Sequence, residues 1–317
     1  MRKINLFIAL VLAICFCSES YAKRVRTAKN ETDVYLNIVV KQQNASIDKN
    51  GLITVSYNNG STLYYTILDN FGNVSLTWDR SNNRQTYNDG VSAYKGDIEI
   101  PSFITIESKG EKEDDIVMTF NVCEIAEDAF NGCSEVTSVS IPYSIRNIRQ
   151  NAFKACSSIQ SFNVNENNNV YMSQDGILFS KSQNILINYP AQKQDSEYTV
   201  PENTTIICPE AFQGNKHLTK VTIGDNVTAI SDFAFQNCAN LEYLHLGNSV
   251  RIIGKGAFRG CPSLNQIHST NVIPPHNCPI VFDSRIKPLC NVVVPTGQID
   301  NYKHRLEWID FQNYTEE

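Results

Sequence analysis

Cysteine has the widest chemistry of the residue types in this sequence, since thiolates ligate zinc, attack electrophiles and form disulfides. Cys133, Cys156, Cys238 and Cys261 each follow the alanine of an Ala-Phe pair by four positions, and Asn215 takes that position in a fifth copy. The asparagine, and the lack of a Cys-x-x-Cys motif after residue 22, argue against zinc or thioredoxin chemistry. We expect this column to be a structural ladder inside a repeating fold, with disulfides or a metal cluster as the alternatives.

Cys278 and Cys290 are the pair outside this column for which we consider a disulfide. They stand close together in the sequence near its C-terminal end, and disulfides persist in proteins that leave the cytoplasm. The sequence leaves open whether they are bridged, and it assigns no role to Cys123 and Cys208.

The histidines offer no catalytic motif. None lies in a Gly-x-Ser-x-Gly or His-Glu-x-x-His setting, and the chain has no glycine-rich phosphate loop. His245 and His268 stand in adjacent repeats and could hold a metal, but no third ligand is visible in their column. We therefore predict a protein that is not an enzyme, with no catalytic residues, no cofactor and no metal site.

The Ala-Phe pair marks a repeat. Three of the four steps between successive pairs have the same 23-residue length, and the remaining step is longer by a 36-residue insertion. An isoleucine stands four positions before each alanine, and an alternating apolar run such as LEYLHLG follows each pair. So short a unit cannot bury its apolar side alone, whereas stacked copies share one core. The pattern predicts a solenoid. The pairs begin at Ala129, Ala152, Ala211, Ala234 and Ala257.

Each unit contains two extended pieces and a corner. The alternating run predicts a short strand with its apolar side chains inward, and segments such as Val250 to Ile253 predict a second one. The Ala-Phe-x-x-Cys segment has helical spacing, so we expect one helical turn at the corner. Phenylalanine and alanine would fill a large and a small space in each layer.

These residues resemble the BspA-like leucine-rich repeat family, whose unit reads roughly L-x-x-V-x-I-P-x-S-V-x-x-I-G-x-x-A-F-x-x-C. Residues 136–156 and 241–261 match it nearly column for column, and the resemblance extends from about Asp97 to the C-terminus. It implies a β-rich α/β solenoid with 23-residue leucine-rich repeats, an N-terminal β region and a C-terminal cap. The insertion looks like the hairpin-bearing long repeat of such proteins, with Asp175 and Gly176 in a turn.

The N-terminus predicts export. Arg2 and Lys3 precede an apolar run from Leu6 to Cys17, and small residues at Ser20 and Ala22 fit a cleavage site. No later stretch approaches the length of a membrane span. The net charge of −6 disfavours nucleic acid and anionic lipid as partners. We expect a location at the cell surface, in the medium or in the periplasm.

Between residues 34 and 94 the repeat is absent. The runs VYLNIVV, GLITVSY, STLYYTIL and NVSLTW are typical of strands separated by turns. The predicted division is a signal peptide (1–22), a disordered linker (23–33), an N-terminal β cap or small β domain (34–96), BspA-like leucine-rich repeats (97–290, with the insertion within 157–206) and a C-terminal cap (291–317).

The candidate binding residues alternate with the apolar residues of the strands. A stack of parallel strands exposes them as a ribbon, the surface that solenoids use for extended partners; plain solvated sheet residues are the alternative. The resemblance implies a non-enzymatic exported recognition protein, for adhesion or for binding host surface or matrix protein or other cells. The expected partner-binding residues are Lys220, Thr222, Tyr243, His245, Gln266 and His268.

A second function remains open for the N-terminal β region. Its aromatic residues could form a carbohydrate-binding module, with the repeats as a spacer, or they could be there because aromatic side chains favour β packing. These residues are Tyr57, Tyr64, Tyr65, Trp78, Tyr87 and Tyr94.

Overall fold

The computed structural model describes residues 42–48, 51–57, 60–78, 94–108, 116–278 and 280–317. The predicted signal peptide and linker lie outside these residues. Within them the only helix is α3 (Ile299–Lys303), and no helix there has the length and apolarity needed to cross a membrane. The chain divides into two compact units, which are described separately.

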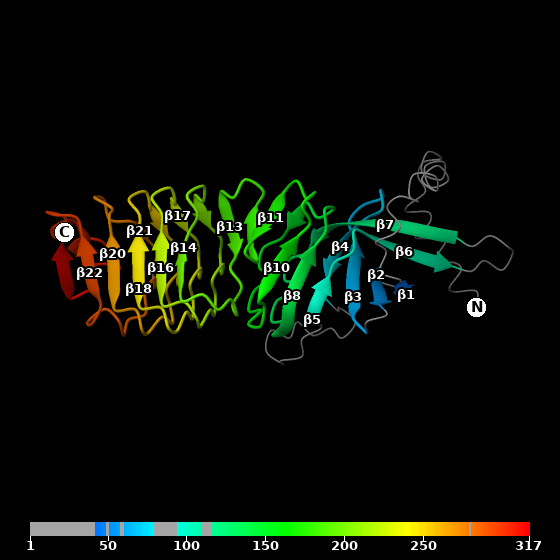
Figure 1. Cartoon of the computed structure of the whole chain (residues 1–317), viewed down its shortest axis with the longest axis horizontal. Helices are drawn as coiled ribbons and strands as arrows, with labels where there is room; N and C mark the ends of the chain where they lie inside the picture. Colours follow the sequence, from blue (N-terminus) through cyan, green and yellow to red (C-terminus); the bar gives the residue numbers. More distant parts are fainter. Residues whose placement is uncertain (1–41, 49–50, 58–59, 79–93, 109–115, 279) are drawn as a thin grey trace. The chain divides into compact units, whose positions relative to one another are not determined.

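The first unit is built on one seven-stranded sheet (Figure 1). Its first four strands pair as an antiparallel meander, the fourth runs parallel to β7, and β7 pairs with β6 and β9. The strands are β1 (Gln42–Ile47), β2 (Leu52–Tyr57), β3 (Thr62–Ile67), β4 (Asn73–Thr77), β6 (Phe103–Ser108), β7 (Ile116–Ile125) and β9 (Asn147–Ile148).

Three of the β-type runs predicted from the sequence thus become β2, β3 and β4, and the first run, VYLNIVV, lies outside the described residues. Alternating apolar residues fill the core of this unit: Ile53, Val55, Tyr65 and Val74 are fully buried.

The second unit contains the repeats. It holds a three-stranded sheet of β5 (Lys95–Glu99), β8 (Glu135–Ile141) and β10 (Ser161–Val164), and two longer ladders of short strands. Ladder one is β11 (Tyr171–Gln174), β12 (Ile177–Ser180), β13 (Ile185–Asn188), β15 (Ile206–Ile207), β17 (Ala229–Ile230), β19 (Ile252–Ile253) and β21 (His276–Asn277). Ladder two is β14 (Glu197–Thr199), β16 (Lys220–Ile223), β18 (Tyr243–Leu246), β20 (Gln266–Ser269), β22 (Asn291–Val294) and β23 (Asn313–Glu316).

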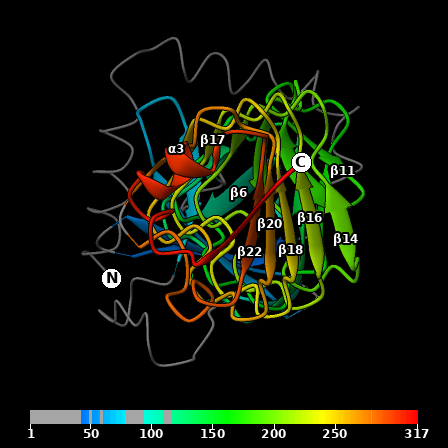
Figure 2. The same cartoon turned by 90° about the vertical axis from the view of Figure 1, so that its left-hand side faces the viewer.

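Each coil from β15 to β22 contributes one strand to each ladder. The pairing is parallel and keeps the register of the sequence repeat, so that Lys220 lies opposite Tyr243 and Tyr243 opposite Gln266. Seen along the stack in Figure 2, ladder two lies on one side of the coils and α3 on the other. The predicted solenoid is confirmed for these repeats.

The corners differ from the prediction, because the Ala-Phe segments form turns rather than helical turns. Phe233 and Asn237 have left-handed backbones (φ 58° and 63°). The Phe235 N–H donates to Ala257 O of the next coil at 2.8 Å, and Asn237 N–H to Arg259 O at 2.8 Å. These N–H groups bond to the neighbouring coil, so they are not available to a helix. The described architecture is therefore a β-solenoid, and the α/β label is not supported.

The insertion widens ladder one. β11 and β12 form an antiparallel hairpin, and β12 pairs antiparallel with β13 before the parallel stack resumes at β15. Asp175 (φ 51°) and Gly176 (φ 78°) make the tight turn of the hairpin, which is the left-handed pair that such turns require. The hairpin is thus confirmed, whereas the domain boundaries predicted from the sequence stay predictions.

A column of phenylalanine rings runs through the core of the stack. The rings of Phe212, Phe235, Phe258 and Phe282 are stacked nearly parallel, with successive centroids 4.4, 5.1 and 5.6 Å apart. The first three are fully buried. Trp308 meets Phe282 edge-on at 5.2 Å and covers the end of this column. The inner rings each pack between two equivalent rings, so the repeat supplies its own core contacts.

Replacing one ring tests this dependence. Phe235→Ala should lower the free energy of unfolding by about 3–5 kcal/mol, because it removes a fully buried ring and leaves a cavity between two others. Urea denaturation followed by circular dichroism measures this. Lys255→Ala, at an exposed corner position, is the control and should change stability by less than about 0.5 kcal/mol. Equal effects of the two substitutions would contradict the role of the ring column.

Candidate interaction face

The outward side of ladder two carries all six predicted partner-binding residues. In β16, β18 and β20 the inward Val221, Leu244 and Ile267 are fully buried. The residues between them are partly exposed, because successive side chains of a strand point to opposite faces. The register places them in two columns: Lys220, Tyr243 and Gln266 form the first column, and Thr222, His245 and His268 form the second.

The first column begins with an ion pair and an aromatic contact. Lys220 Nζ donates to Glu197 Oε2 at 3.1 Å, and the same ammonium lies 5.8 Å from the centroid of the Tyr243 ring. The Lys220 and Glu197 side chains are 44% and 65% exposed, so their pairing adds little to stability. The ion pair places the Lys220 ammonium beside the Tyr243 ring of the neighbouring strand β18.

The second column brings two imidazoles together. His245 Nδ1 lies 3.3 Å from His268 Nδ1, and the rings meet edge to face. The Tyr243 hydroxyl lies 3.2 Å from the same His268 Nδ1. On its other side, His268 Nε2 pairs with Glu317 Oε1 at 2.5 Å.

Sequence reasoning missed Glu317. It follows β23, which pairs in parallel with β22, and no repeat pattern covers this strand. Because 49 residues separate it from His268, no signal in the sequence links the two side chains. Only the order of strands in the ladder brings them together.

The surroundings of His245 lower its pKa. Burial is the main cause that lowers its pKa below 6.5, and the nearby His268 adds to this, while Asp225 and Glu317 act in the opposite direction. A neutral imidazole keeps a lone pair, so it can accept a hydrogen bond or bind a cation.

The cysteine column lies on the inside of the corner. Cys238 Sγ donates to Phe212 O at 3.2 Å, and Cys261 Sγ donates to Phe235 O at 3.1 Å. Both thiols therefore bond to a carbonyl of the preceding coil. Cys133 and Cys156 occupy the same sequence position and are also buried.

Asn215 does more at this position than the thiols do. Its amide donates to Pro190 O at 3.2 Å, and its Oδ1 accepts from the backbone N–H groups of His217 and Leu218, both at 2.9 Å. The fully buried asparagine thus satisfies three backbone groups where the coil before it belongs to the insertion. These contacts support our proposal that the cysteine column has a structural role.

Cys278 and Cys290 are not joined by a disulfide. Cys278 follows β21 of ladder one, whereas Cys290 precedes β22 of ladder two. The chain crosses from one side of the coil to the other between them, and disulfide geometry requires closely spaced Cα atoms.

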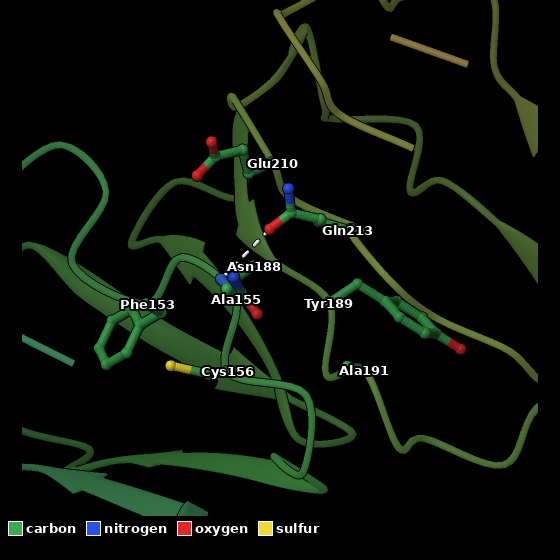
Figure 3. A pocket seen from close by; sticks show the side chains of 8 residues that line it. All are labelled: Phe153, Ala155, Cys156, Asn188, Tyr189, Ala191, Glu210 and Gln213. Atoms are coloured by element: carbon green, nitrogen blue, oxygen red, sulfur yellow. Dashed lines mark hydrogen bonds between the residues drawn. The ribbon is translucent and has the colours of Figure 1, made fainter. Parts of the chain in front are cut away.

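A small cavity lies near the insertion (Figure 3). Its lining includes Phe153, Tyr189 and Glu210, and Gln213 Oε1 accepts from Ala155 N–H at 3.2 Å across it. Lys154 Nζ pairs with Glu210 Oε1 at 2.8 Å. Its volume of about 10 Å³ accommodates roughly one water molecule, far below what an organic ligand needs. The cavity is therefore not a small-molecule site.

Comparisons with known proteins agree with the geometry. The family described as BspA type leucine rich repeat region matches in six copies, over residues 109–192 and 188–275. No curated protein sequence matches the chain.

Among solved structures, a leucine-rich repeat protein from Eubacterium ventriosum is similar to this chain, with a TM-score of 0.55 and 18% identity. The aligned region covers 86% of this chain and 84% of that chain. This likeness shows the fold. Two further structures are more distant. The pneumococcal vaccine antigen PcpA has a TM-score of 0.42 at 16% identity, with 87% of this chain and 99% of that chain covered. A leucine rich cell surface protein from Faecalibacterium prausnitzii has a TM-score of 0.38 at 15% identity, with 87% and 95% covered.

Thiol reactivity tests the cysteine column. Hydrogen bonding with the Cys261 thiol and burial hold the pKa of Cys238 well above its ordinary value, and burial raises the pKa of Cys290 to about 12. In folded protein at pH 8, N-ethylmaleimide should label the partly exposed Cys278 first, and Cys238, Cys261 and Cys290 only after denaturation. Peptide mass spectrometry locates the label. Fast labelling of Cys238 in the folded protein would contradict a structural role.

A second prediction concerns His245. An NMR titration should give it a pKa below 6.5, and His268→Gln should raise that value partway, since burial remains. Because the folded pKa lies below the unfolded one, the stabilisation is present above pH 6.5 and is lost as the pH falls through the folded value. An unchanged pKa in the variant would show that the two rings do not interact.

Proposed function

Because the chain belongs to the BspA-type leucine-rich repeat family, we propose that it is a non-enzymatic recognition protein that binds an extended segment of a partner protein along ladder two. The partner is a host surface or matrix protein, or a protein of another cell. The N-terminal sequence pattern supports an exported protein.

One observation carries this proposal. β16, β18 and β20 pair in register, and their partly exposed side chains form two columns that change chemically from coil to coil. Adjacent strands lie about 4.8 Å apart, so an extended chain laid across the ladder would meet a new side chain at each coil. Such faces are the binding surfaces of solenoid proteins.

The side chains of the face are suited to protein recognition. Tyrosine is enriched among the residues that dominate interface energetics, and Tyr243 stands in the middle strand between Lys220 and Gln266. Thr222 and the two histidines add hydrogen-bonding groups beside it. A partner with carboxylates near Lys220 and hydrogen-bonding groups over the second column fits this arrangement.

Three of the N-terminal aromatic residues considered for carbohydrate binding are buried. Tyr57, Tyr65 and Tyr94 are each at most 5% exposed, and the hydroxyls of Tyr57 and Tyr65 lie 3.1 Å apart within the core. Sugars stack on exposed rings, whereas these three rings are buried. The packing interpretation is better supported for them. Tyr64 and Trp78 are partly exposed, and Tyr87 lies outside the described residues.

Binding assays with matched variants test the protein-binding proposal. The chain should bind at least one of a panel of immobilised fibronectin, collagen and laminin, and Tyr243→Ala should weaken that binding by tenfold or more, since interface hot spots cost about 2 kcal/mol or more. Surface plasmon resonance measures the affinities.

Arg251→Ala provides the control. Arg251 is exposed and directly precedes β19 of ladder one, so its loss should leave binding unchanged. Absence of binding to the whole panel, or an equal loss in the Arg251 variant, would contradict binding through ladder two.

A further inference from the structure

Three donor atoms converge on the outward side of β18 and β20. They are the Nδ1 atoms of His245 and His268, 3.3 Å apart, and the Tyr243 hydroxyl, 3.2 Å from His268 Nδ1. They come together because His245 and His268 are direct partners in the ladder, while Tyr243 lies two positions before His245 on the same face.

We propose that His245, His268 and Tyr243 form a binding site for one divalent transition-metal ion of the zinc type. Ligands in a tetrahedral zinc site bind at about 2.0–2.1 Å, which places neighbouring ligand atoms about 3.3 Å from one another. The two separations in this cluster have that length. Both donors that lie beside His268 Nδ1 are therefore at the separation that neighbouring ligands of a tetrahedral ion have, and water would complete the coordination.

The contact with Glu317 orients His268 as a metal ligand. His268 Nε2 and Glu317 Oε1 are in hydrogen-bond contact, so the proton of a neutral His268 ring lies on Nε2 and the lone pair lies on Nδ1. That lone pair faces His245 and Tyr243. A carboxylate on the outer nitrogen of a ligating histidine is the usual arrangement in zinc proteins, where it fixes the tautomer and the ring orientation.

Two protonated imidazoles with facing nitrogens would repel each other, and only a neutral ring has a lone pair for an ion, so metal binding requires both rings in their neutral form. The His268 side chain is only 17% exposed, so few water molecules compete with it for an ion. Binding would require His245 to carry its proton on Nε2, leaving Nδ1 as the ligand.

The donor set selects the class of metal. Imidazole nitrogens suit zinc, nickel and copper, while calcium and magnesium prefer oxygen ligands. Among the described residues, no group of three or more His, Cys, Asp or Glu side chains is arranged around a common ion position. The phenol oxygen of Tyr243 supplies the third donor here, since Glu317 faces the outer nitrogen of His268.

Isothermal titration of the untagged full-length chain with Zn²⁺, in reducing buffer, tests the proposal. One ion per chain should bind, and Co²⁺ should give the visible absorption of a tetrahedral site. His245→Gln and His268→Gln should each weaken Zn²⁺ binding by at least about tenfold. Glu317→Gln, which removes only the partner of His268, should weaken it by about 10-fold or more. Tyr243→Phe should also weaken it and change the Co²⁺ spectrum.

His217→Gln is the matched control, because it removes a histidine whose Nε2 contacts Gln192 and Gln194 instead of this cluster. Thermal melting by circular dichroism confirms that each variant is folded. The proposal is overturned if no Zn²⁺ binds at millimolar concentration, if binding survives in folded His245 and His268 variants, or if His217→Gln weakens it as much as they do. An unchanged affinity and spectrum in Tyr243→Phe would likewise overturn the proposed three-residue site.

Discussion

The hydrogen bonds between the corner backbones of successive coils are the interactions on which the repeat unit depends. Phe212 N–H donates to Ala234 O at 2.7 Å, and Phe235 N–H to Ala257 O at 2.8 Å. Because these bonds recur from coil to coil, the coils that form them share nearly the same length and the same corner. The phenylalanine column follows from this, since equal coils place equal side chains above one another. The thiol-to-carbonyl contacts of Cys238 and Cys261 follow in the same way.

The same constraint creates the outer face. A fixed register places the outward residues of ladder two in columns, at a spacing that lets neighbouring side chains touch. Inside the coil this favours identical residues, because a stacked core needs the same volume in each layer. Outside the coil it leaves the residue types free to vary. Lys220, Tyr243, His245 and His268 therefore distinguish this outer face from that of a uniform repeat, and both proposed binding sites consist of residues of this face.

Repetition also explains where prediction from the sequence was wrong or silent. The Ala-Phe-x-x-Cys segment has the spacing of a helical turn, yet every second N–H of this corner bonds to the next coil, as those of Phe235 and Asn237 show. Local spacing cannot reveal that competition, because the acceptors belong to the next copy of the repeat. The pairing of Cys278 with Cys290 was left open for a similar reason, since only the path of the chain shows that they flank different ladders.

By itself the sequence determined the solenoid, its repeat period, the inward columns and the side of the strands that faces outward. Each of these depends on periodicity, and five aligned copies display periodicity directly. The tertiary structure alone decided how far apart the side chains of neighbouring coils lie, and which side chain at the end of the last strand lies beside them. The 3.3 Å approach of His245 to His268 and the contact of Glu317 with the latter join atoms far apart in the chain. No pattern encodes such distances, because they arise only when the strands are paired.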